Sequence, residues 1–152
     1  MTANRSHFVY VTYIRTTPAK LWKALTDPAF VRQYWFDTTV ECSWQQGAPW
    51  KLVGADGRLM DSGEILEIEP PRRMVIRWRN VWKPELEAEG ASRCTIELEP
   101  VDRSVKLTIT HELERPDSKF IAAVSGGWPI IASNLKSLLE TGELALAAHP
   151  GH

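Results

Sequence analysis

His111 is the residue in this sequence that is best placed to do chemistry. It lies in phase with Ile109 and Leu113 in an alternating segment, 104–114, so its side chain is expected on the inner face of a sheet. A histidine beside a pocket could orient a ligand hydroxyl or act as an acid or base. The alternative, which we favour, is a structural histidine whose ring is hydrogen-bonded by a neighbouring side chain or backbone group.

Seven tryptophans make up the second chemically informative set. Each is large and carries an N–H that needs a partner when it is buried. Trp78 and Trp128 are in phase with inward-facing apolar residues, whereas Trp35 and Trp50 lie near the ends of expected elements. These four side chains could fill a core or form the wall of a cavity, and the sequence leaves both alternatives open.

Other catalytic or ligand-binding patterns are weak. The sequence has no Gly-x-Ser-x-Gly elbow, and Gly126-Gly127 is not followed by the Lys-Ser/Thr pair of a phosphate-binding loop. Its four histidines and two cysteines lack metal-ligand spacing. We therefore predict no catalytic residue, no cofactor and no metal site. The four histidines are His7, His111, His149 and His152.

Arginines alternate along the segment 72–79 and could form a basic stripe for single-stranded nucleic acid. Glutamates occupy the segments expected to be its neighbours, so cross-strand ion pairs on a solvated sheet face are the favoured explanation. The formal net charge of -1 likewise gives no general attraction to nucleic acid or to an anionic membrane. We predict no nucleic-acid partner.

Composition and length indicate one globular domain over residues 1–152, partly disordered from about residue 143. No apolar run reaches the ~18 residues of a membrane span, and the N-terminus lacks the apolar core of a signal peptide. We therefore expect a cytoplasmic protein that does not insert into membranes. Cys42 and Cys94 are expected to be reduced thiols.

The elements that must position these residues begin with a strand at 7–15. Thr17-Pro18 and Asp27-Pro28 then each start a short helix. Six strands follow, with Asp56-Gly57 as a hairpin turn, Gly63 as a bulge and 83–91 as an acidic loop. This order favours an antiparallel sheet with its helices segregated to one side, the α+β class.

The C-terminal part of the chain is expected to be helical in two pieces. Asp117 is predicted to cap a helix over 118–125, which Gly126-Gly127 interrupts. Pro129 suits the first turn of a second helix, and Gly142 suits its C-cap. Its apolar stripe comprises Trp128, Ile131, Leu135, Leu138 and Leu139.

Several motifs, in this order, resemble the helix-grip (START-like) superfamily called SRPBCC. Within it, the chain is similar to the branch named for homologues of the activator of the heat-shock protein 90 ATPase. The matching segments span nearly the whole chain: TPAKLWKALTDPAFVRQYW (17–35), GEILEIEPPRRMVIRW (63–78), CTIELEP (94–100), VKLTITHE (105–112) and GGWPIIASNLKSLLETG (126–142).

This resemblance implies a curved antiparallel sheet of about seven strands around a long C-terminal helix, with two short helices after the first strand. It also implies a cavity between helix and sheet that holds a small apolar molecule, aromatic compounds included. The expected ligand-binding residues are Trp35, Trp50, Trp78, Ile109, His111, Trp128, Ile131 and Leu135.

We expect a binding protein rather than an enzyme, and two alternatives stay open. One is a cyclase- or aromatase-like enzyme that uses the same pocket, with His111 and another polar group converging on it. The other is a chaperone co-factor or protein-interaction module with a protein partner or a second copy of the chain. That alternative predicts an exposed apolar patch of more than a few hundred Å².

Overall fold

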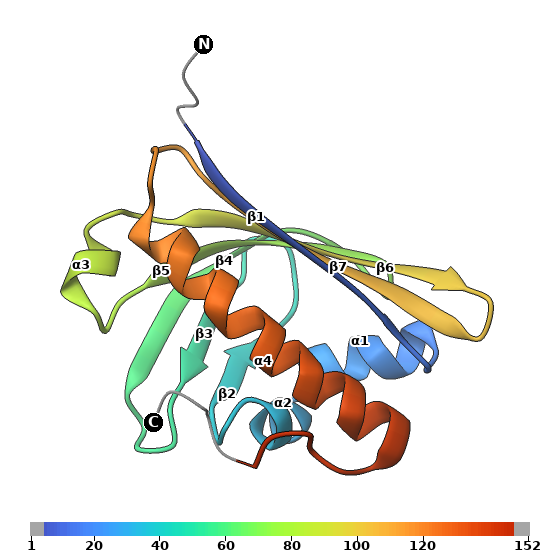
Figure 1. Ribbon diagram of the computed structural model, residues 1–152. Helices are drawn as coiled ribbons and strands as arrows, with labels where there is room; N and C mark the ends of the chain where they lie inside the picture. Colours follow the sequence, from blue (N-terminus) through green and yellow to red (C-terminus); the bar gives the residue numbers. More distant parts are fainter. Residues whose placement is uncertain (1–4, 148–152) are drawn as a thin grey trace.

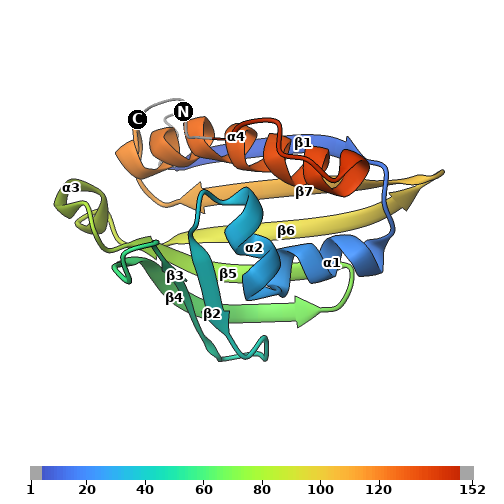
Figure 2. The same ribbon diagram turned by 90° about the horizontal axis from the view of Figure 1, so that it is seen from below.

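A computed structural model describes residues 5–147 of the chain. Its seven strands form one antiparallel sheet in the order β1-β7-β6-β5-β4-β3-β2, so β1 and β2 are its edges. Figures 1 and 2 show the sheet curving around the C-terminal helix, as expected for a helix-grip fold. The strands are β1 (Ser6–Ile14), β2 (Thr39–Cys42), β3 (Pro49–Val53), β4 (Leu59–Glu69), β5 (Arg73–Asn80), β6 (Ser92–Val101) and β7 (Ser104–Leu113).

Two short helices follow β1 and begin where the sequence predicts. In α1 (Pro18–Thr26), the Thr17 side chain accepts a hydrogen bond from the Lys20 N–H. In α2 (Pro28–Tyr34), the Asp27 side chain accepts one from the Ala29 N–H. Proline occupies the first helical position of both, where its missing N–H costs nothing. Figure 2 shows both helices on the same side of the sheet as the C-terminal helix.

The C-terminal helix, α4 (Lys119–Thr141), is continuous, which corrects the predicted break at Gly126-Gly127. Gly126 and Gly127 each cost the helix interior about 1 kcal/mol relative to alanine, and Pro129, which lies inside α4 and not in the first turn of a second helix, costs about 3 kcal/mol. Packing of the buried face of α4, which includes Trp128 and Ile131, offsets these costs. The N-cap is Ser118, whose side chain accepts from the Ile121 N–H, rather than Asp117. Gly142 ends the helix in the left-handed conformation, as predicted.

Gly63 is not a bulge, contrary to prediction. It pairs regularly with Trp78, and the irregularity in the β4–β5 pairing lies between Ile65 and Glu67. A Cβ added to Gly63 would lie 1.6 Å from the Arg77 carbonyl oxygen. Glycine at this position therefore permits a close approach of two backbones.

The segment 83–91 is also more ordered than the predicted loop, because it contains the short helix α3 (Pro84–Glu87). Leu86 of this helix is buried. The Arg79 guanidinium donates to the Glu87 carbonyl oxygen at 3.1 and 3.3 Å, which ties the helix to β5. The loop thus forms a packed wall at one end of the sheet (Figure 1).

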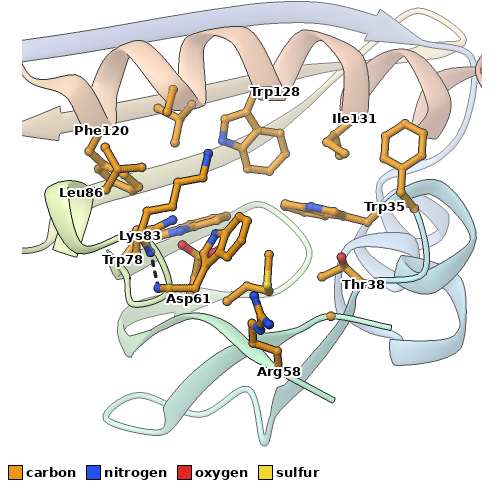
Figure 3. A pocket seen from close by; sticks show the side chains of 18 of the residues that line it. Trp35, Thr38, Arg58, Asp61, Trp78, Lys83, Leu86, Phe120, Trp128 and Ile131 are labelled. Carbon is orange, nitrogen blue, oxygen red and sulfur yellow. Dashed lines mark hydrogen bonds between the residues drawn. The ribbon is translucent and has the colours of Figure 1, made fainter. Parts of the chain in front are cut away.

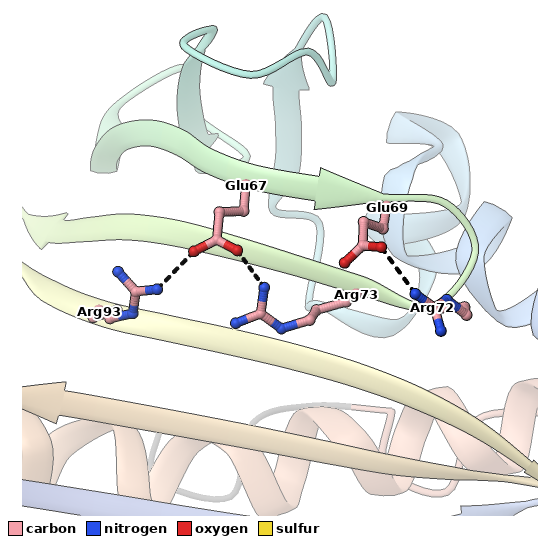
Figure 4. A network of polar contacts seen from close by, with 5 residues as sticks. All are labelled: Glu67, Glu69, Arg72, Arg73 and Arg93. Atoms are coloured by element: carbon pink, nitrogen blue, oxygen red, sulfur yellow. Dashed lines mark hydrogen bonds and ion pairs between the residues drawn. The ribbon is translucent and has the colours of Figure 1, made fainter.

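Alternation in β7 separates an inner face from an outer face as predicted. Its inward residues are all buried and comprise Val105, Leu107, Ile109, His111 and Leu113. On the outer face, Glu67 accepts hydrogen bonds from Arg73 at 2.5 Å and Arg93 at 2.8 Å (Figure 4). Cross-strand pairing therefore accounts for this part of the basic stripe. Those two arginines also hold the pKa of Glu67 below its usual range.

Candidate functional site

A cavity of about 660 Å³ lies between the first half of α4 and the part of the sheet where β4 begins and β5 ends. Its walls come from the α2–β2 connection, the β3–β4 hairpin, the end of β5, α3 and α4. Figure 3 shows its side chains converging from these elements. Drug-sized ligands bind in cavities of roughly 300–1,000 Å³, so this volume is sufficient for a small molecule.

Four of the eight predicted site residues line this cavity: Trp35, Trp78, Trp128 and Ile131. The ring centroids of Trp35 and Trp128 are 5.2 Å apart, with an edge-on arrangement, and Trp35 lies 6.2 Å from Trp78. Phe120 and Leu86 extend the apolar wall toward the start of α4. Aromatic faces of this kind favour a flat apolar ligand.

The other four predicted residues do not line the cavity. Trp50 is 2% exposed and packs against Trp78, with ring centroids 4.3 Å apart. Ile109 and Leu135 are fully buried in the core. Trp50, Ile109 and Leu135 belong to the same core cluster as the cavity-lining Trp78 and Trp128. In-phase positions identify the inner face of a strand or helix, but they do not distinguish its open part from its filled part.

His111 is likewise behind the wall, and both of its ring nitrogens are occupied. The Trp128 indole N–H donates to Nε2 at 2.9 Å, so Nε2 carries no proton in this arrangement. Nδ1 then carries the proton and donates to Ser92 Oγ, 2.9 Å away. The Ser92 hydroxyl in turn points to the Trp78 carbonyl oxygen at 3.5 Å. The side chains of Ser92 and His111 thus link β5, β6 and β7 to α4 by hydrogen bonds.

Burial lowers the pKa of His111 to about 3, because the charged imidazolium is disfavoured away from water. The ring is therefore neutral at physiological pH and acts as a fixed hydrogen-bonding group. A cyclase-like mechanism based on His111 would require the ring both to reach the cavity and to exchange protons. Neither requirement is met in the described arrangement.

Asp61 is a cavity residue that the sequence reasoning missed. It lies on β4 in phase with Gly63 and the buried Ile65, so an acid at an inward position was the available signal. Burial raises the pKa of Asp61 to about 6, and this effect exceeds the opposing hydrogen bonds from the Trp78 and Asn80 side chains. A carboxyl of this kind changes charge near neutral pH.

Two cations and one exposed indole form the mouth of the cavity. Trp82 is 39% exposed, and the Arg58 guanidinium carbon and the Lys83 ammonium lie 5.7 and 5.2 Å from its ring centre. Arg58 also lies 3.9 Å from the Asp56 carboxylate. Arg58, Asp56, Asp61 and Lys83 are the charged residues that line the cavity in the described part of the chain.

Glu89 fixes the α3 wall to the start of α4. Its carboxylate accepts from the Ser118 hydroxyl at 2.5 Å and from the Lys119 and Phe120 N–H groups at 2.9 and 3.1 Å. Burial raises the pKa of Glu89, but these hydrogen bonds and the charge of Arg115 outweigh it, so the pKa is lowered overall. The carboxylate therefore caps the helix in its charged form.

The order of elements and the helix gripped by the sheet place the chain in the SRPBCC class of folds. Residues 15–140 match the family described as "Activator of Hsp90 ATPase homolog 1-like protein". The chain belongs to this family. No curated protein sequence matches the chain.

Solved structures show the same fold at low sequence identity. A protein from Mesorhizobium loti is 23% identical with a TM-score of 0.77, over 91% of this chain and 100% of that chain. The Aha1 dimer from Colwellia psychrerythraea is 18% identical with a TM-score of 0.73, over 90% and 98%. DynU16, a protein of the dynemicin biosynthetic locus, is 21% identical with a TM-score of 0.74, over 91% and 48%.

Among residues 5–147, no helix is long and apolar enough to cross a membrane. In the same range, no group of three or more His, Cys, Asp or Glu residues is placed to hold a metal ion. His149 and His152 lie outside the described residues. Cys42 and Cys94 are free thiols, as expected.

Proposed function

We propose that this protein binds a small apolar, aromatic molecule in the cavity between α4 and the sheet. The observation that carries the proposal is a 660 Å³ cavity whose wall includes four tryptophans: Trp35, Trp78, Trp82 and Trp128. A core that only needed filling would close over such a space, because protein interiors pack with few voids larger than a water molecule. The similarity to a protein of the dynemicin biosynthetic locus supports the same proposal.

Tryptophan fluorescence tests this function directly. A panel of apolar aromatic compounds is titrated into the protein, and saturable quenching or a spectral shift is expected for part of the panel. Calorimetry on the responding compounds should give one site per chain. A panel without any saturable response, together with no protection against thermal unfolding, would contradict the proposal.

A second candidate function is protein interaction, which the outer face of β1 favours. Val9, Val11 and Tyr13 alternate along this edge strand and are 52%, 44% and 50% exposed. Sheet edges and apolar patches are both surfaces on which another chain can pack. The family description and the similarity to an Aha1 dimer support this candidate.

Sedimentation over a range of protein concentrations tests self-association through β1. Association that the Val11→Lys variant abolishes would support a homodimer, whereas a monomer at every concentration would contradict it. Stimulation of the ATPase of purified Hsp90 tests a chaperone partner separately. Val11→Lys should leave ligand binding unchanged, because Val11 does not line the cavity.

A further inference from the structure

Lys83 places an unpaired positive charge at the mouth of the cavity. Among residues 5–147 its ammonium group has no hydrogen bond or ion pair, and its nearest described interaction is with the Trp82 ring at 5.2 Å. Figure 3 shows the Lys83 side chain directed into the cavity toward α4. The charge is therefore available to a molecule that occupies the cavity.

The backbone that carries Lys83 is held by a buried side chain. Asn80 Oδ1 accepts hydrogen bonds from the Lys83 N–H at 3.0 Å and the Trp82 N–H at 3.2 Å. Asn80 is 7% exposed, so this turn is anchored in the protein interior. A fixed backbone limits the conformations from which the lysine side chain must be ordered when an anion binds.

Arg58, the other cation at the mouth, is partly neutralised. It lies 3.9 Å from the Asp56 carboxylate, and both side chains are more than half exposed, at 58% and 66%. The backbone N–H of Arg58 also donates to Asp56 Oδ1 at 2.9 Å, which keeps the two residues together. Lys83 is therefore the cation whose charge a ligand could balance.

The remaining charged residue of the wall in the described part of the chain, Asp61, limits how many charges such a ligand can carry. A second anionic group beside Asp61 would meet a carboxyl group that repels it when ionised. An uncharged hydroxyl or carbonyl there could instead share a hydrogen bond with the carboxyl. The wall made by Trp35 and Trp128 is apolar and suits a ring system.

We propose that the cavity selects an aromatic acid whose ring packs against Trp35 and Trp128 and whose single anionic group lies beside Lys83. This inference rests on the proposed binding function and assigns the chemical class of its ligand. Carboxylate, sulfonate and phosphate share the required charge and acceptor oxygens. A cationic aromatic ligand is the opposite case, since Lys83 and Arg58 would repel it at the mouth.

Two dyes that differ by one anionic group test the assignment: anilinonaphthalene sulfonate and the uncharged N-phenylnaphthylamine. Lys83→Met removes the charge and keeps an unbranched chain of similar length. The substitution should lower the affinity for the sulfonate dye by about three- to tenfold, which is the range between an exposed and a partly desolvated charge pair. The affinity for the neutral dye should change by less than about twofold.

Lys20→Met is the matched control, because Lys20 is an exposed lysine of α1 that does not line the cavity. Added salt should lower the affinity for the sulfonate dye in the wild type and in Lys20→Met, and it should lower it less in Lys83→Met. If the neutral dye binds but Lys83→Met leaves the sulfonate dye unchanged, the proposed binding function stands and this inference is wrong. If neither dye binds the wild type, this inference is wrong, whereas the proposed binding function is wrong only if the whole panel of aromatic compounds also gives no saturable response.

Discussion

The indole N–H of Trp128 donates to Nε2 of His111 at 2.9 Å and joins the middle of α4 to β7, the strand next to the edge strand β1. The same indole presents its ring to the cavity. One residue therefore both holds the helix against the sheet and forms part of the candidate binding surface. A change at Trp128 would alter stability and ligand binding together, so other positions must be used to separate the two.

Replacing His111 should change how stability depends on pH. The folded protein holds the pKa of His111 at about 3, whereas an unfolded histidine titrates near 6.5. The unfolded state therefore binds more protons, and the contribution of the neutral ring is lost as pH falls below about 6.5. Between pH 7 and pH 5 this loss amounts to about 2 kcal/mol in the free energy of unfolding.

Urea unfolding at both pH values measures this effect. His111→Gln should be less stable than the wild type at pH 7 and should lose less stability on acidification. Asp61 acts in the opposite direction, because its pKa is raised to about 6 and its contribution is lost as pH rises through that value. Parallel pH profiles for wild type and His111→Gln would contradict the neutral, buried assignment.

Filling the cavity from α4 should block ligand binding without unfolding the protein. A Cβ added at Gly127 meets no heavy atom within 4 Å, and Gly127 lines the cavity. Gly127→Phe is therefore expected to occupy the ligand volume and lower affinity for an apolar aromatic compound by at least about tenfold. Fluorescence titration provides the measurement.

Gly126 offers a matched control one position away. A Cβ there also meets no heavy atom within 4 Å, but Gly126 is exposed and does not line the cavity. Gly126→Phe should retain wild-type affinity. Equal loss of binding in both variants would point to a disturbed helix and would count against the cavity as the binding site.

Asp61 should make the binding of an anionic ligand depend on pH. The charged groups of the wall in the described residues are Asp56, Arg58, Asp61 and Lys83, and burial raises the pKa of Asp61 to about 6. Above that pH its carboxylate repels an anion, so affinity for anilinonaphthalene sulfonate should fall between pH 5 and pH 7.5. Asp61→Asn should remove most of this dependence, so that at pH 7.5 the variant binds the dye up to about tenfold more tightly than the wild type.

N-phenylnaphthylamine is the reference for this titration, because an uncharged dye does not sense the Asp61 charge directly. Its affinity should vary by less than about twofold across the same range. If Asp61→Asn keeps the full pH dependence of the sulfonate dye, another group controls it and the role assigned to Asp61 is wrong.

Removing the Glu89 carboxylate should loosen α3 and the start of α4 together. Glu89→Ala is expected to lower the free energy of unfolding by about 0.5–2 kcal/mol, as for the loss of other helix N-caps. Amide exchange at Lys119 and Phe120, whose N–H groups lose their acceptor, should accelerate. Glu87→Ala is the control, since its side chain makes no hydrogen bond to α4 in the described residues.

Most of the fold could be predicted from the sequence because its signals are local. The Thr17-Pro18 and Asp27-Pro28 starts and the alternation of β7 depend on residues within one element. The predicted break at Gly126-Gly127 was wrong because packing of Trp128 and Ile131 on the sheet decides the helix there, and that contact joins distant segments. Local propensity is only a weak guide in such cases.

The candidate site was predicted only in part for the same reason. Phase along a strand placed His111 inside, but its hydrogen-bond partners come from β6 and α4. Asp61 and Lys83 belong to segments that meet only after the β4–β5 hairpin has formed. An inward acid on a half-buried strand is a usable signal, whereas a lysine after a strand end is too common to be one.

The indoles described above also form one optical unit. Trp50 lies 4.3 Å from Trp78, Trp78 lies 5.9 Å from Trp128, and Trp128 lies 5.2 Å from Trp35, measured between ring centroids. Chromophores this close share their excitation, so the near-ultraviolet circular dichroism should contain coupled bands. A ligand that touches Trp35 would then quench emission that originates from the buried Trp50, which does not line the cavity.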